Sequence, residues 1–74
     1  MEVRIGVQDI SHDIVFESDS EPQDLAEVIS TSWANEEMIT LHDSKGRRIL
    51  VPSDKIGFIE LGPPTREQVG FGVG

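Results

Sequence analysis

The sequence contains no cysteine and no tyrosine, and only one tryptophan and three phenylalanines among its 74 residues. Without cysteine, neither a disulfide nor a thiolate metal site can stabilise the fold. A chain of this length buries only about 60% of the surface that its unfolded form exposes, so its stability margin is small. Its apolar residues, 36% of the total, must suffice alone or be covered by a second copy of the chain. This balance favours a single domain that self-associates.

Long apolar runs and positive charges are also scarce. No run approaches the ~20 apolar residues of a membrane-spanning helix, and the first residues lack the basic and apolar regions of a signal peptide. Six lysines and arginines face fourteen acidic residues, which gives a formal net charge of -8. Such an excess of acid opposes non-specific binding to nucleic acid and to anionic membranes. We therefore expect a cytoplasmic protein that does not bind membranes.

The first quarter of the chain has the pattern of a β-hairpin. Val3, Ile5 and Val7 alternate with more polar residues or glycine, which is the period of a strand with one buried face. Residues 14–16 form a second short β-rich run. Since only a few turn-forming residues separate the two runs, they are expected to pair as a hairpin.

Residues 22–34 are predicted to form an amphipathic helix. Its apolar stripe follows the spacing i, i+3, i+4, i+7 and i+8, which is met by Leu25, Val28, Ile29, Ser32 and Trp33. Two starts remain open: Ser20 caps the helix, or Glu21 caps it with Pro22 at the first helical position. Asn35 is expected to end the helix in the left-handed conformation.

Three further strands are predicted in the second half, at 38–42, 47–51 and 55–61. Residues 43–46 supply a hairpin connection in which Gly46 can take a positive φ. Pro52 closes the fourth strand because proline cannot donate to a strand ladder.

The predicted order is ββαβββ, an α+β fold with one amphipathic helix packed on an antiparallel-rich five-strand sheet. A β-grasp-like mixed sheet is the alternative. The single domain is expected to span residues 1–62, followed by a C-terminal tail at 63–74. In this tail apolar residues alternate with glycine from Val69 to Gly74. Two interpretations of the tail remain open, an unstructured terminus and a sixth strand.

Strands four and five contain consecutive apolar residues, Ile49-Leu50-Val51 and Phe58-Ile59. Strands that are apolar on both sides are typical of sheets buried on both faces. One helix cannot cover both faces of a five-strand sheet. The pattern therefore predicts a dimer, a larger assembly or a strongly curled sheet.

No catalytic, cofactor-binding or metal site is expected. Ser11, His12 and Asp13 are neighbours in sequence, and such side chains point apart instead of forming a triad. The doublets His12-Asp13 and His42-Asp43 would have to converge to hold a metal, and further ligands are not evident. The glycine pattern of the tail precedes no helix, so it lacks the context of a nucleotide-binding loop.

The candidate binding residues are four cations of the 45–55 hairpin, Lys45, Arg47, Arg48 and Lys55, together with Trp33. Three interpretations of the cations remain open. They form a solvated edge that deters aggregation, a patch for an acidic protein surface such as the acidic first half of another copy, or a contact to phosphate or RNA. Trp33 lies at the rim of the helix stripe and is interpreted as packing or interface, with a ligand platform as the alternative.

Several blocks along the chain resemble one family of small proteins. They are Met1–Gln8, Ile14–Ser18, Lys45–Pro52, Asp54-Lys55, Glu60–Gly62 and Val69–Gly72. On these blocks the sequence is similar to small actinobacterial proteins of unknown function, some loosely labelled "ATP-binding". The resemblance covers nearly the whole chain and implies a stand-alone cytoplasmic protein. It supplies no functional residues, and no nucleotide motif in the sequence supports the label.

The sequence thus predicts a small binding or adaptor module that self-associates or binds a protein partner and is not an enzyme. The alternative is a nucleic-acid-binding accessory protein that uses the basic 45–55 hairpin.

Overall fold

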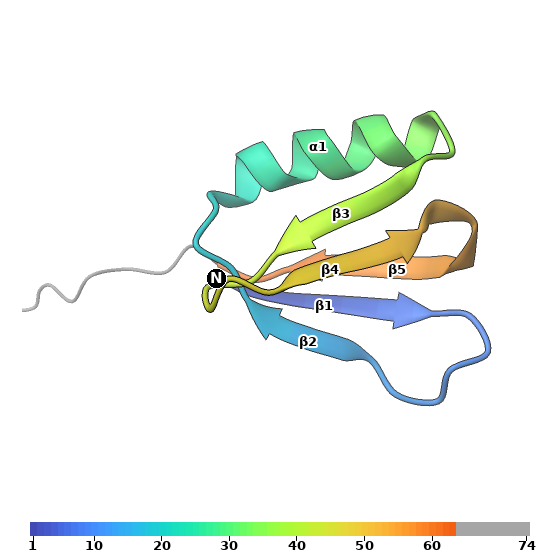
Figure 1. The fold of residues 1–74 in the computed structure, drawn as a ribbon, viewed down its shortest axis with the longest axis horizontal. Coiled ribbons are helices and arrows are strands. Elements are labelled where there is room, and N and C mark those ends of the chain that lie inside the picture. Colours follow the sequence, from blue (N-terminus) through green and yellow to red (C-terminus); the bar gives the residue numbers. More distant parts are fainter. Residues whose placement is uncertain (64–74) are drawn as a thin grey trace, which may run out of the picture.

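The computed structural model describes residues 1–63, so the predicted tail at 63–74, apart from its first residue, lies outside the described residues. The predicted order ββαβββ is confirmed (Figure 1), with one additional short 3-10 helix. The elements are β1 (Glu2–Val7), β2 (Ile14–Glu17), α1 (Pro22–Ala34), β3 (Met38–His42), β4 (Arg48–Pro52), η1 (Ser53–Lys55) and β5 (Ile56–Leu61).

The five strands form two antiparallel sheets. One sheet has three strands in the order β2-β1-β5, and the other is the hairpin β3-β4. The α+β class and the antiparallel pairing are confirmed. Since every strand pair among residues 1–63 is antiparallel, the mixed sheet of the alternative does not occur there.

One apolar core lies between the two sheets and α1. Its buried apolar residues come from every strand and from the helix: Met1, Val3, Ile5, Phe16, Leu25, Ile29, Ile39, Leu41, Val51 and Ile56. The helix lies along β3 (Figure 1) and also contacts η1. The two sheets are joined where the backbone N–H of Ser44 donates to the carbonyl of Glu17 at 2.8 Å. The five strands therefore lie in two sheets around one core, and not in the single five-strand sheet that the sequence predicts.

The bounds predicted for α1 are confirmed. Glu21 is the N-cap and Pro22 the first helical residue, as in the second predicted start, although no side chain bonds the free amides. Leu25 and Ile29 are buried. Val28 lies outside the core and is 51% exposed. Among residues 1–63, no helix is long and apolar enough to cross a membrane.

The predicted left-handed stop at Asn35 is wrong, because the left-handed residue is Glu36. Asn35 has φ -89°, whereas Glu36 has φ 58°. The N–H of Glu36 donates to the carbonyl of Trp33 at 3.1 Å, and that of Glu37 donates to Ser32 at 2.9 Å. These two bonds form a Schellman motif. It places the positive φ one residue beyond the C-cap, where a side chain carries a steric cost.

We expect Glu36→Gly to stabilise the fold, because glycine adopts a positive φ without that cost. The gain in the free energy of unfolding should be about 1 kcal/mol. Chemical denaturation followed by circular dichroism measures it. The matched control is Glu37→Gly, since positive φ values among the described residues occur only at Asp9, Glu36 and Gly46. An equal gain at Glu37 would contradict the explanation.

The curl of the sheets shelters one side of each two-sided apolar strand. Ile49 and Ile59 are partly buried against the core, and Val51 is 3% exposed. Phe58 remains 46% exposed, with its ring lying over the space beside Gly6. Leu50 is 57% exposed. Within residues 1–63 the chain thus leaves part of its apolar strand surface open.

Candidate functional site

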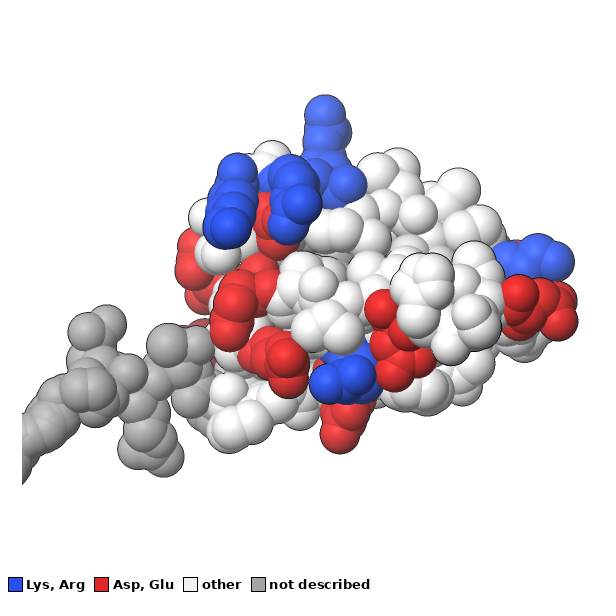
Figure 2. Space-filling view, turned by 90° about the horizontal axis from the view of Figure 1, so that it is seen from below, with Lys and Arg blue, Asp and Glu red and all other residues white. Residues whose placement is uncertain are grey.

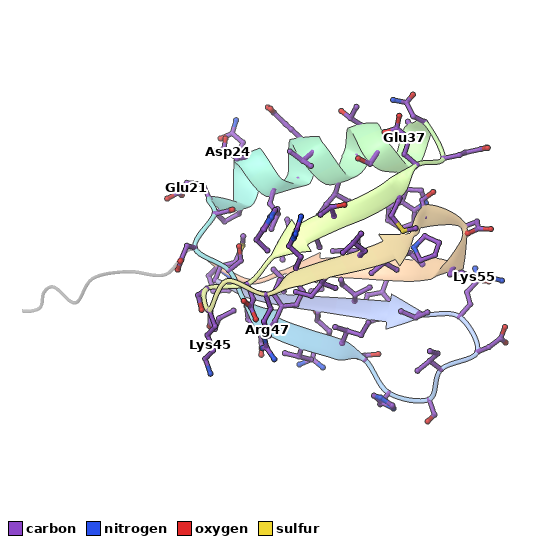
Figure 3. All side chains as sticks on the ribbon, in the orientation of Figure 1. Glu21, Asp24, Glu37, Lys45, Arg47 and Lys55 are labelled. Atoms are coloured by element: carbon purple, nitrogen blue, oxygen red, sulfur yellow. The ribbon has the colours of Figure 1, made fainter. Side chains whose placement is uncertain are left out.

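The structure divides the four predicted hairpin cations into two groups. Lys45 and Arg47 lie at one end of the molecule, at the loop between β3 and β4, and Lys55 lies at the opposite end (Figure 3). Arg48 begins β4, directly after this loop. The five residues of β4 are extended, and a strand rises by about 3.3 Å per residue. The strand therefore holds the two groups of cations apart. Most of the blue surface in Figure 2 accordingly gathers at one end. The predicted cluster is therefore a group of three cations, without Lys55.

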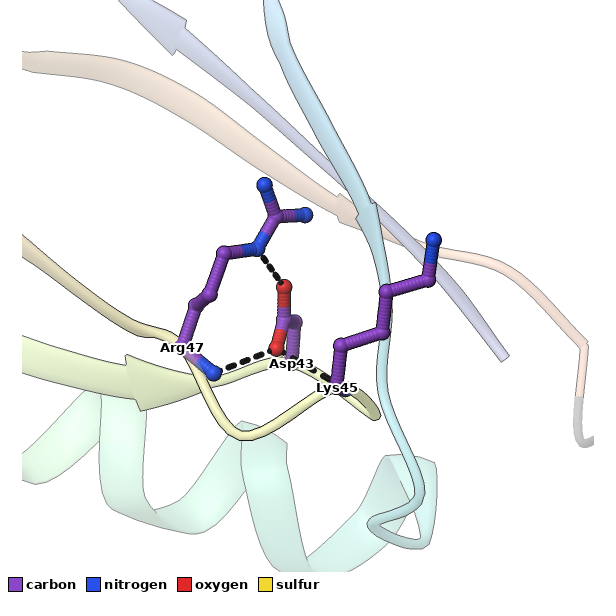
Figure 4. Close-up of polar contacts among 3 residues, drawn as sticks. All are labelled: Asp43, Lys45 and Arg47. Atoms are coloured by element: carbon purple, nitrogen blue, oxygen red, sulfur yellow. Dashed lines mark hydrogen bonds and ion pairs between the residues drawn. The ribbon is translucent and has the colours of Figure 1, made fainter.

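Asp43 organises the loop that carries these cations (Figure 4). Its Oδ1 accepts the backbone N–H of Lys45 at 2.9 Å and that of Arg47 at 2.7 Å, and its Oδ2 accepts the Nε–H of Arg47. The Asp43 side chain is only 2% exposed. Burial alone raises the pKa of Asp43. The hydrogen bonds from Arg47 and Lys45 and the charge of Arg47 outweigh this effect, so the pKa lies below its ordinary value.

Not every cation of the described residues is equally available to a partner. Arg47 pairs with Asp43, and Arg4 pairs with Asp13 and Glu60. Lys45 and Arg48 have no ion pair within residues 1–63, so they are the available cations of the hairpin end. Arg47, one of the three cations there, is partly neutralised by Asp43. Fewer positive charges are therefore free to contact a phosphate than the sequence suggested. The nucleic-acid alternative stays a prediction.

The strongest candidate surface is the side of the β3–β4 hairpin that faces away from the core. We call it the outer face, and it consists of three cross-strand pairs, Met38 with Pro52, Thr40 with Leu50 and His42 with Arg48. All six residues are exposed, whereas their neighbours Ile39, Leu41 and Val51 are buried. Leu50 at 57% and Met38 at 53% are the most exposed large hydrophobic residues of the described chain.

One end of the outer face opens into a depression of about 590 Å³ with a mixed lining. Its apolar residues are Trp33, Met38 and Pro52, and its acidic residues are Glu36, Glu37 and Asp54. Trp33 is 37% exposed, so its ring is partly packed and partly accessible. We call the three carboxylates the acidic rim. Their combination with an open indole is suited to a cationic side chain, which is attracted by the carboxylates and by the aromatic face.

Sequence reasoning missed several residues of this surface. Leu50 carried a signal, because it is apolar at a position where regular alternation between Ile49 and Val51 calls for a polar residue. Met38 carried a weaker one as the first residue of a predicted strand. The acidic rim carried none, because Asp54 lies far along the chain from Glu36 and only the fold brings them to one depression.

The structure places the two His-Asp doublets on different parts of the chain. His12 lies in the connection between β1 and β2, whereas His42 ends β3. The carboxylate of Asp13 faces Arg4 at 3.4 Å, and that of Asp43 is occupied by the loop. Among residues 1–63, no three His, Cys, Asp or Glu side chains are grouped so that they could hold a metal ion.

Comparison with known proteins gives a family and no activity. The model of a family described as "Protein of unknown function (DUF3107)" matches residues 1–72. A search of the curated proteins finds no matching sequence. The resemblance to a small family of unknown function is confirmed, and the actinobacterial origin stays a prediction.

Proposed function

The chain belongs to the DUF3107 family, and we propose that it is a small protein-binding module that acts through the outer face of β3–β4. In this proposal it works in the cytoplasm by binding and not by catalysis, and the first protein that it binds is a second copy of itself.

The observation that carries the proposal is the exposure of Leu50 and Met38 on one face. The two residues are diagonal neighbours in the register, since Thr40 pairs with Leu50 and Met38 with Pro52. Complete burial of such a side chain contributes about 1.5–3 kcal/mol relative to full exposure. Because both side chains are roughly half exposed in the single chain, covering each of them with a partner should stabilise the complex by about half of that amount. A small domain with a small apolar core is stabilised when association covers such a surface.

The test is to place a charge at the centre of the outer face. We expect the wild-type chain to self-associate in sedimentation velocity runs across micromolar concentrations. Leu50→Glu should weaken the association by at least about tenfold, because it removes apolar contact and buries a carboxylate in the interface. Thermal unfolding of the dilute variant should stay close to wild type, since Leu50 contributes little to the core.

The matched control is Val28→Glu, which introduces the same charge at a residue of similar exposure, 51%. Val28 lies five positions before Trp33 and thus about 140° around α1 from it. The control should associate as the wild type does. A wild-type chain that remains monomeric, or a control that weakens association as much as Leu50→Glu, would overturn the proposal.

A further inference from the structure

We infer that two copies of the chain pack their outer faces antiparallel about a two-fold axis, with Arg48 and Lys45 of each copy on the Trp33 depression of the other. The inference rests on the proposed function and adds to it the arrangement and the polar contacts of the interface.

The register of the hairpin places the axis. Thr40 and Leu50 form the central pair, with the pair of His42 and Arg48 two residues away on one side and the pair of Met38 and Pro52 two residues away on the other. Two residues of antiparallel strand span about 7 Å. A two-fold axis that lies between the sheets of the two copies and crosses the strands at the level of the central pair therefore places the His42–Arg48 pair of each copy over the Met38–Pro52 pair of the other.

The charges of the outer face are complementary under the same rotation. Its hairpin end carries Arg48 and, in the adjoining loop, Lys45, neither of which has an ion pair among residues 1–63. Its other end carries the acidic rim of Glu36, Glu37 and Asp54. Lys55 follows Asp54 but does not line the depression; its carbonyl accepts the N–H of Gln8 at 2.8 Å, in the direction of β1. Positive and negative ends therefore meet twice in the dimer, once at each end.

Side-chain lengths suit this arrangement. Packed sheets lie about 10 Å apart, a gap that long arginine and lysine side chains span. The planar guanidinium of Arg48 can stack on the indole of Trp33 while it donates to a rim carboxylate. In the parallel arrangement, Arg48 and Lys45 of the two copies would face each other, and so would the two acidic rims. This repulsion selects the antiparallel dimer.

The end of α1 places two of the rim carboxylates beside Trp33. Glu36, at φ 58°, lies in the lining. This conformation directs the chain from α1 into β3 and presents two neighbouring carboxylates beside Trp33.

A charge exchange between two variants tests the arrangement. The first variant is Lys45→Glu/Arg48→Glu and the second is Glu36→Lys/Glu37→Lys. Each alone should associate at least about tenfold more weakly than the wild type, because like charges meet at both ends. An equimolar mixture should form a one-to-one heterodimer within about threefold of the wild-type affinity. Sedimentation equilibrium and native mass spectrometry measure the affinity and the composition, and circular dichroism checks that both variants fold.

The outcomes separate this inference from the proposed function. Suppose that Leu50→Glu abolishes the association of the wild type, but that the mixture of the two charge-exchanged variants does not associate. The outer face then binds a second copy in another arrangement, and the inference is overturned. If mass grows beyond the dimer with concentration, the contact is head-to-tail and not closed by a two-fold axis, which also overturns it. If the wild type is monomeric at all concentrations, the proposed function itself is overturned. A closed one-to-one heterodimer in the mixture supports both the inference and the proposed function.

Discussion

Leu41→Ala is expected to remove a large part of the protein's free energy of unfolding. Leu41 is 1% exposed and lies in the core between the sheets and α1. Truncation of a buried leucine to alanine costs about 2–5 kcal/mol, because the lost apolar contact leaves a cavity. Domains are stabilised by only about 5–15 kcal/mol, and a chain of this size belongs near the lower end. Chemical denaturation followed by Trp33 fluorescence measures the loss.

The chain offers a control of the same residue type in the same hairpin. Leu50→Ala removes the same atoms from a side chain that is 57% exposed, so its cost in the monomer should stay within about 0.5 kcal/mol. Both variants are compared at concentrations below the onset of association. Equal losses for the two leucines would contradict the assignment of Leu41 to the core and Leu50 to the surface.

The elements of this fold were predictable because local patterns determine them. The apolar spacing that ends at Trp33, with Pro22 at its start, predicted the bounds of α1, and Pro52 predicted the end of β4. The positive φ expected at Gly46 is confirmed at 86°. In each case residues that are close together in the sequence determine the local backbone, so the sequence around the element is sufficient.

The parts that could not be predicted depend on packing between distant elements. The sequence showed that Ile49, Leu50 and Val51 are all apolar, but which of them remains exposed is decided by how the hairpin curls onto the core. Lys55 was grouped with the other cations because it is near them in sequence, whereas an extended β4 places it at the opposite end. The left-handed conformation assigned to Asn35 followed residue preference, whereas Asn35 is the C-cap and the left-handed residue of the Schellman motif is Glu36.

Asp43→Ala is expected to cause the largest loss of stability among the polar residues of the β3–β4 loop. It removes the carboxylate that accepts two backbone N–H groups and the Arg47 side chain. The same loop joins the two sheets through the bond from Ser44 to Glu17, so disorder in the loop spreads to both. Thermal unfolding at neutral pH measures the fall in melting temperature. The melting temperature of Asp43→Asn should fall less, because the amide oxygen of asparagine can still accept hydrogen bonds from the two backbone N–H groups.

The lowered pKa of Asp43 also makes the contribution of this loop dependent on pH. Burial opposes the charged form, but the bonds from Arg47 and Lys45 stabilise it more, so the folded protein holds the proton less tightly than the unfolded chain does. The stabilisation is therefore fully present above the ordinary aspartate pKa of 3.8 and is lost as the pH falls through the lower pKa of the folded state. Melting temperatures between pH 7 and pH 2 should converge for wild type and Asp43→Asn at the acid end. A constant gap between the wild type and Asp43→Asn would show that the Asp43 carboxylate contributes no charge-dependent stabilisation to the turn.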